Sequence, residues 1–186
     1  MGKARPLPVV RLQHRRNRTP TGKRTGTPAR KAADYFAFGQ VNKAAHRTAD
    51  QQRGDWLGPG GERHTHEAVM AWAHSQARQH EHTFQALLSV PQARLTGQDY
   101  VRALEAAGQT AGWRMVVHND TAYSHAHVLF FRDRRLPRAE FEQWQAQVQQ
   151  ALLTLEEKRL TEPALGLGDA AEQLEAVSFR YGPELG

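Results

Sequence analysis

The sequence of 186 residues contains no cysteine, which excludes disulfide bonds and any metal site built from thiolates. It has no apolar run as long as a membrane-spanning helix, and its basic first residues lack the apolar stretch of a secretory signal. These absences predict a soluble, cytoplasmic protein without a membrane partner. The length is sufficient for one core domain of ordinary size with extensions.

Acidic residues are absent from residues 1–30, where nine lysines and arginines lie. The other 156 residues carry 16 basic and 19 acidic side chains, so the net charge of +6 originates at the N-terminus. Because this segment is also poor in apolar residues, we predict a disordered arm over residues 1–30. A basic arm suits a polyanion, although a merely solubilising tail is the alternative. The predicted nucleic-acid contacts are Arg11, Arg15, Arg16, Arg18, Lys23 and Arg24.

The remaining chain alternates between strand and helix patterns. The predicted strands cover residues 31–39, 83–90, 112–118 and 125–132, and the predicted helices cover residues 65–80, 96–107 and 137–160. Thr65 and Thr96 are predicted N-caps, and Gly108 is predicted to end the second helix. Residues 40–63 are polar and glycine-rich, which indicates a loop.

This order of elements predicts an α+β fold, in which a mainly antiparallel sheet carries helices on one face. We expect a core domain over residues 31–160 and a C-terminal extension over residues 161–186. The extension has the pattern of a short helix at 171–177 and of a short strand at 177–181. The open face of the sheet is the predicted position of a metal site.

That site is predicted from one short segment in which two apolar runs flank His118, Asp120, His125 and His127. Residues i and i+2 of a strand point to the same face, so His125 and His127 project together. Pairing of the two runs as a hairpin places His118 beside them. Three imidazoles make a metal site, and an acidic residue within reach can orient one of them or accept a proton. The alternative is incidental clustering, since the chain holds ten histidines.

Three neutral histidine ligands leave coordination positions open for a substrate oxygen, and with a basic arm the indicated substrate is a phosphodiester. By ligand preference, an all-histidine set favours Zn²⁺, Ni²⁺ or Cu²⁺. The nucleophile is then water or a tyrosine, whose phenoxide forms stable phosphate esters. Tyr35 lies beside the arm, Tyr100 has the setting of a packing residue, Tyr123 falls in the hairpin turn and Tyr181 lies near the C-terminus.

The segment His118-x-Asp120-x4-His125-x-His127, followed by apolar residues, resembles the three-histidine motif of mobilisation relaxases, members of the His-hydrophobic-His endonuclease superfamily. The order of the flanking elements extends the resemblance over residues 31–160. The motif is fairly specific, whereas the order of elements is weak support. One departure is Ala126, which is smaller than the usual residue between the paired histidines.

The resemblance implies a metal-dependent enzyme that nicks single-stranded DNA at an origin of transfer and transfers the strand. It implies that His118, His125 and His127 hold Mg²⁺ or Mn²⁺, and that Asp120 orients a histidine or helps to deprotonate the nucleophile. Tyr35 matches the nucleophile that becomes joined to the 5′ phosphate. Accessory mobilisation proteins are implied partners. Two other functions stay open: a non-catalytic DNA-binding module on the same fold, and a metal-dependent phosphodiesterase that uses water.

Overall fold

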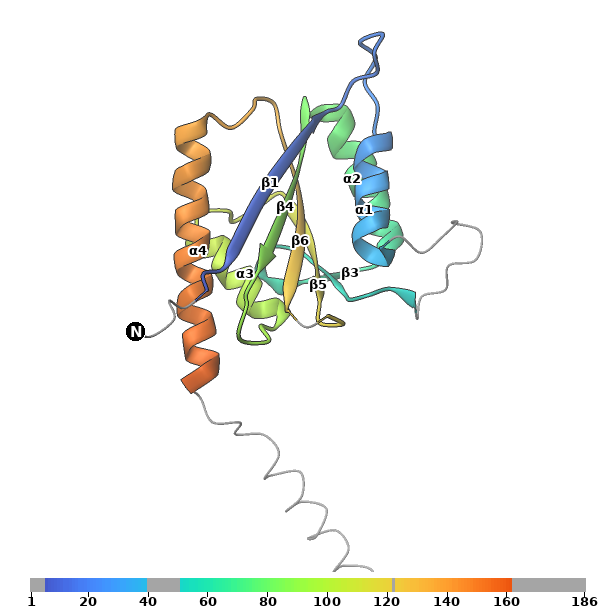
Figure 1. The fold of residues 1–186 in the computed structure, drawn as a ribbon. Coiled ribbons are helices and arrows are strands. Elements are labelled where there is room, and N and C mark those ends of the chain that lie inside the picture. Colours follow the sequence, from blue (N-terminus) through green and yellow to red (C-terminus); the bar gives the residue numbers. More distant parts are fainter. Residues whose placement is uncertain (1–5, 40–50, 122, 162–186) are drawn as a thin grey trace, which may run out of the picture.

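The computed structural model describes residues 6–39, 51–121 and 123–161, whose arrangement is drawn in Figure 1. Its strands are β1 (Val9–Arg16), β2 (Trp56–Leu57), β3 (Arg63–His64), β4 (His82–Ser89), β5 (Trp113–His118) and β6 (His125–Arg132). Its helices are α1 (Thr27–Phe38), α2 (His66–Gln79), α3 (Gly97–Ala106) and α4 (Arg138–Thr161), with a short 3-10 turn, η3 (Pro59–Gly61). The strands form one antiparallel sheet in the order β1-β4-β6-β5-β2-β3. The predicted α+β class with an antiparallel sheet is confirmed.

The predicted hairpin lies in the middle of this sheet. Strand β6 pairs with β5 on one side and with β4 on the other. Val128 and Phe130 of β6 belong to one hydrophobic cluster, whereas Leu129 and Phe131 belong to another. A strand that is apolar on both faces is typical of a central position, because a solvent-facing side would be polar.

Helices cover both faces of the sheet, which corrects the expectation of helices on one face (Figure 1). Helices α3 and α4 pack on the face that carries Phe84 and Val128, and α1 and α2 pack on the face that carries Val116 and Leu129. Two apolar faces each need a covering layer, so a single layer of helices would leave one exposed. The α1 side is also the side from which the three histidines project, because residues alternate along β5 and β6.

Residues 9–16 form strand β1, which corrects the prediction of a disordered arm over residues 1–30. All eight residues pair with β4, from Val9 opposite Ser89 to Arg16 opposite His82. Val10 is buried among the residues of the α4 side, and the side chain of Gln145 in α4 donates to its carbonyl oxygen. The backbone pairs regardless of side-chain charge, and basic side chains on an edge strand discourage further pairing. The basic composition of the segment therefore hid the alternation of its side chains between the two faces of the sheet.

Helix α1 occupies the region where a strand was predicted over residues 31–39. Its buried face follows helical spacing: Ala29, Ala32, Ala33, Phe36 and Ala37. Pro28 lies in the first turn, where a missing N–H has no cost, and alanine has the highest helix propensity. The helix ends at Gly39, whose φ of 66° is a left-handed conformation that favours glycine. The first turn of this helix lies within residues 1–30, whose basic composition predicted an arm.

The other predicted helices and their ends are confirmed. The Thr65 side chain accepts from the Ala68 N–H at the start of α2. Thr96 and Asp99 form a capping box at the start of α3, and Gly108 follows that helix with a φ of 78°. The two caps fix the starts of α2 and α3 after β3 and β4, and Gly108 begins the loop that leads into β5.

The predicted loop over residues 40–63 is described from residue 51, and it contains β2, where Trp56 is buried and pairs with Val116 of β5. The short helix predicted at 171–177, the strand at 177–181 and Tyr181 lie outside the described residues. None of the helices in the described ranges has the combination of length and apolarity that a membrane span requires.

Candidate metal centre

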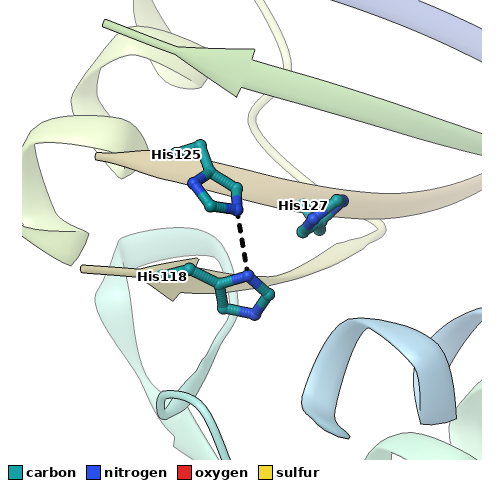
Figure 2. A group of neighbouring side chains, drawn as sticks. All are labelled: His118, His125 and His127. Atoms are coloured by element: carbon teal, nitrogen blue, oxygen red, sulfur yellow. Dashed lines mark hydrogen bonds between the residues drawn. The ribbon is translucent and has the colours of Figure 1, made fainter. Parts of the chain in front are cut away.

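The three predicted metal ligands meet where β5 ends and β6 begins (Figure 2). The strand register places His118 directly opposite His125, and it places His127 opposite Val116, two residues before His118. One ring nitrogen from each of the three histidines lies within 4.8 Å of the others. The hairpin geometry expected from the sequence is thereby confirmed, and the side chains converge without any rearrangement of the strands.

A hydrogen bond to the backbone fixes the tautomer of His118. Its Nε2 lies 2.7 Å from the carbonyl oxygen of Phe36, which can only accept, so Nε2 carries the hydrogen. His125 Nδ1 lies 3.2 Å from the carbonyl oxygen of Tyr123, and it donates there in the tautomer that leaves Nε2 available for a metal. In that tautomer, Nδ1 of His118 and Nε2 of His125 both bear lone pairs. Backbone carbonyls orient both rings in the manner typical of metal-bound histidines.

Those two nitrogens lie 3.1 Å apart, and in the other tautomer of His125 its Nε2–H donates to His118 Nδ1 (Figure 2). A cation can replace this hydrogen bond, because nitrogens bound at ~2.0–2.1 Å with tetrahedral or octahedral angles lie roughly 2.8–3.4 Å apart. His127 supplies a third nitrogen from the same strand as His125. The described residues therefore fit a divalent metal ion held by three imidazoles, and the donor set leaves positions free for oxygen ligands.

Burial keeps two of these imidazoles neutral. It lowers the pKa of His118 from 6.5 to about 4, with a further contribution from the positive charge of Arg53. It lowers the pKa of His127 to about 3, with further contributions from His118 and His125. A neutral imidazole binds metal without first releasing a proton, so protons compete poorly for these ligands at neutral pH.

The C-terminal turns of α1 form the wall beside the cluster. The Phe36 ring stacks on His127, with ring centroids 4.5 Å apart and planes at 22°. The Tyr35 ring meets His127 edge-on, with centroids 6.3 Å apart. Tyr35 is 49% exposed, so its side chain lies at the surface of the site and not in the core. The structure thus brings the predicted nucleophile beside the predicted ligands, from a helix instead of a strand.

The other described tyrosines are placed differently. Tyr100 is fully buried on α3, and its hydroxyl donates to Ser124, which fits the packing role expected from the sequence. Burial raises the pKa of Tyr100 above its ordinary value of 10.0. Tyr123 lies in the turn and is 58% exposed, and its described contacts to His125 are made through its backbone oxygen. Tyr35 is therefore the tyrosine side chain whose ring contacts the cluster among the described residues.

Asp120 makes an ion pair that the sequence did not reveal. Both of its carboxylate oxygens accept from Arg53, at 2.7 Å from Nε and 2.9 Å from Nη2. The Arg53 guanidinium lowers the pKa of the Asp120 carboxyl below its ordinary range. Asp120 was predicted to orient a histidine. The carbonyl oxygens of Phe36 and Tyr123 contact the rings of His118 and His125 instead. No signal in the sequence marked Arg53, which precedes Asp120 by 67 residues.

Two adjacent hollows lead away from the cluster between β1 and α1. The first, of about 220 Å³, is lined by Arg11, Gln13, Tyr35 and His127 among others. The second, of about 430 Å³, is lined by Arg15, Lys31 and again Tyr35. The strand register explains why Arg11 and His127 line the same hollow. Arg11 lies opposite Leu87, which in turn lies opposite His127. Residues paired across antiparallel strands share a face, so Arg11 and Arg15 project on the same side as the histidines.

The remaining predicted nucleic-acid contacts gather at the far end of β1. Arg16, Arg18 and Arg24 all pair with Glu81, at 3.3, 2.8 and 3.1 Å. Lys23 is exposed on the turn between Arg18 and Arg24, which form an isolated antiparallel bridge. Three guanidiniums around one carboxylate keep this end of the strand positive, although part of their hydrogen-bonding capacity is used within the protein.

Comparisons of the chain with protein-family models, with curated proteins and with solved structures gave no match.

Proposed function

We propose that this protein is a metal-dependent, relaxase-type endonuclease that nicks single-stranded DNA through Tyr35 and transfers the strand. The observation that carries the proposal is the position of the Tyr35 ring, 6.3 Å from that of His127, at the junction of the two hollows. A nucleophile, three metal ligands and basic side chains thereby share one surface. The resemblance of the histidine motif to mobilisation relaxases supports the same activity.

His118, His125 and His127 would hold the metal ion, Mg²⁺ or Mn²⁺ by the resemblance and Zn²⁺ or Ni²⁺ by ligand preference. The bound ion would supply Lewis-acid polarisation of a non-bridging phosphate oxygen. The three rings are positioned before a metal binds, because carbonyl oxygens orient two of them and Phe36 stacks on the third.

In the proposed reaction the Tyr35 oxygen forms a bond to phosphorus and the bond from phosphorus to the 3′ oxygen breaks. The phenol proton passes to the departing 3′ oxygen, directly or through solvent. One phosphodiester is replaced by another, so neither an oxidant nor an energy-rich cofactor is needed. Attack by a 3′ hydroxyl on the tyrosyl ester reverses the step, and this reversal is the strand transfer. The exposed position of Tyr35 suits a residue that becomes esterified to a polymer.

The two hollows suit a single strand better than a duplex. They run between a strand and a helix, and their lining combines the cationic Arg11, Arg15 and Lys31 with the amides of Gln13 and Gln85. Guanidinium and ammonium groups bind phosphates, while amide side chains hydrogen-bond the exposed edges of unpaired bases. We propose DNA at an origin of transfer as the substrate, with accessory mobilisation proteins as partners.

A covalent adduct tests the proposal. The protein is incubated with Mn²⁺ and a pool of labelled single-stranded oligonucleotides, and denaturing electrophoresis reports label that remains attached to protein. Wild-type protein and Tyr123→Phe are expected to form the adduct, whereas Tyr35→Phe is expected to form none. Tyr123→Phe is the matched control, because it removes an exposed hydroxyl from the turn of the same hairpin.

The outcomes separate the alternatives. Cleavage without an adduct, unchanged in Tyr35→Phe, would indicate a phosphodiesterase that uses water. Binding without cleavage under any metal would indicate a non-catalytic DNA-binding module. An adduct that persists in Tyr35→Phe would overturn the assignment of the nucleophile.

A further inference from the structure

Arg53 lies beside the candidate metal centre and is held there by two independent contacts. Its backbone N–H donates to the carbonyl oxygen of Ala37, in the last turn of α1, at 2.8 Å. Its side chain donates to both oxygens of Asp120, in the turn that follows β5. The guanidinium is therefore anchored between the helix that carries Tyr35 and the turn that joins the metal ligands.

The ion pair with Asp120 uses only part of the guanidinium. An arginine side chain has five N–H donors, and Asp120 occupies the one on Nε and one of the two on Nη2. The two donors of Nη1 have no hydrogen-bond partner among the described residues, and one donor of Nη2 remains. Nη1 and Nη2 together form the second fork of the group, whose geometry matches two oxygens of a phosphate. The side chain is 27% exposed, so this fork has access to ligands.

Space beside the fork is maintained by Gly39. A Cβ atom at this position would lie 3.3 Å from Arg53 Nη1, closer than most such contacts. After burial, the positive charge of Arg53 contributes to the lowered pKa values of His118 and His127. Its contacts with Ala37 and Asp120 place the Nη1/Nη2 fork in the same small region as the proposed nucleophile and ligands.

We infer that Arg53 is an oxyanion-binding residue, whose free Nη1/Nη2 fork binds the non-bridging oxygens of a nucleic-acid phosphate, with Asp120 as its positioning residue. That the phosphate is the one attacked by Tyr35 rests on the proposed function. The binding of a phosphate by Arg53 does not. The three histidines contribute no charge when neutral, so Arg53 supplies a positive charge beside them. Asp120 lowers the freedom of the guanidinium while leaving the local charge balanced until a phosphate arrives.

The inference is tested without any metal, by measuring the binding of a fluorescein-labelled oligothymidylate of about 12 nucleotides. Fluorescence anisotropy reports the binding, and EDTA is present throughout. Each phosphate contact on a single strand contributes about 0.7 to the slope of log affinity against log salt concentration. Arg53→Gln is expected to flatten the slope by about 0.7 and to weaken binding about 10-fold or more at low salt. Arg134→Gln is the matched control, because Arg134 Nη2 donates to the carboxylate of Glu140 outside the lining of both hollows. Its slope should equal that of the wild type.

Arg53→Lys provides a second variant that keeps the charge and loses the fork. It is expected to retain the wild-type slope while binding more weakly than wild type, and a thermal melt checks that each variant is folded. Equal slopes and affinities for wild type and Arg53→Gln would overturn the inference, as would a wild type that does not bind the oligonucleotide. A flattened slope without any adduct under Mn²⁺ would support the inference and count against the proposed catalysis.

The positioning role of Asp120 is tested by a double-mutant cycle on the same binding measurement. If Asp120 acts through Arg53, Asp120→Ala alters oligonucleotide affinity in the wild type and has no further effect in Arg53→Gln. Equal effects in both backgrounds would show that Asp120 does not act through Arg53 and would overturn its assignment.

Discussion

Substitution of His125 by alanine should abolish the stabilisation of the protein by divalent metal with only a small loss of stability in the metal-free protein. A neutral imidazole has one N–H, so the metal-free His125 donates either to the Tyr123 carbonyl or to His118 Nδ1. The loss of that one hydrogen bond costs about 1 kcal/mol.

The expected magnitude follows from mass action. A ligand at 100 times its dissociation constant stabilises the folded state by about 2.7 kcal/mol. For a chain of this size that corresponds to a rise in Tm of roughly 5–11 °C, at about 2–4 °C for each kcal/mol. His125→Ala in EDTA should melt within about 4 °C of the wild type by the same conversion.

Differential scanning fluorimetry with Mn²⁺, Zn²⁺ and Ni²⁺ in turn, each titrated against an EDTA reference, measures both effects. His80→Ala is the matched control, because His80 is a histidine outside the cluster whose ring pairs with the exposed Asp133. The control should keep the full metal-dependent rise. A rise of the same size in His125→Ala would refute the three-histidine centre.

Four further outcomes are expected. Arg11→Gln combined with Arg15→Gln should flatten the salt dependence of oligothymidylate binding by about 1.4, at about 0.7 for each contact, as measured by anisotropy. Acidification of the metal-free protein should lower its Tm as the pH falls from 6.5 toward 4, because burial depresses the pKa values of His118 and His127 and the neutral rings favour the folded state. The free energy of unfolding should fall by up to about 1.4 kcal/mol per pH unit for each of the two groups. His118→Asn should reduce this dependence on pH in melts recorded across the same range. Thr96→Ala should cost about 1 kcal/mol and lower Tm by roughly 2–4 °C, because it removes the capping box of α3.

The candidate metal centre could be predicted from the sequence because its three histidines are close together in the chain. A hairpin of two apolar strands brings His118 opposite His125 through its own register, and the period of two places His127 on the same face. The same holds for the helix caps at Thr65 and Thr96, whose partners lie three residues away. In each case the interacting residues are near one another in the chain, so their spacing in the sequence predicts their contact in the structure.

The features that the sequence did not reveal depend on contacts between distant residues. Arg53 meets Asp120 across 67 positions, and the Phe36 carbonyl meets His118 across 82. No local pattern specifies such pairs. The strand β1 was concealed for a related reason, since its charged residues suggest disorder and only its pairing with β4 shows why Val10 is buried. The position of α1 over the histidines likewise depends on the second apolar face of the sheet.

The placement of β1 at the edge of the sheet determines how the N-terminal region can be dissected. A truncation at residue 30 would remove eight residues of backbone pairing and the first turn of α1, and would leave β4 with a free row of N–H and C=O groups. An unpaired, apolar edge of this kind recruits other chains, so the shortened protein is expected to aggregate. Weak DNA binding by such a truncation would report the loss of the fold and not the loss of positive charge. The effect of the positive charge can be separated from that of the strand only by side-chain substitution. Arg11 and Arg15 can be neutralised while every backbone hydrogen bond to β4 is retained.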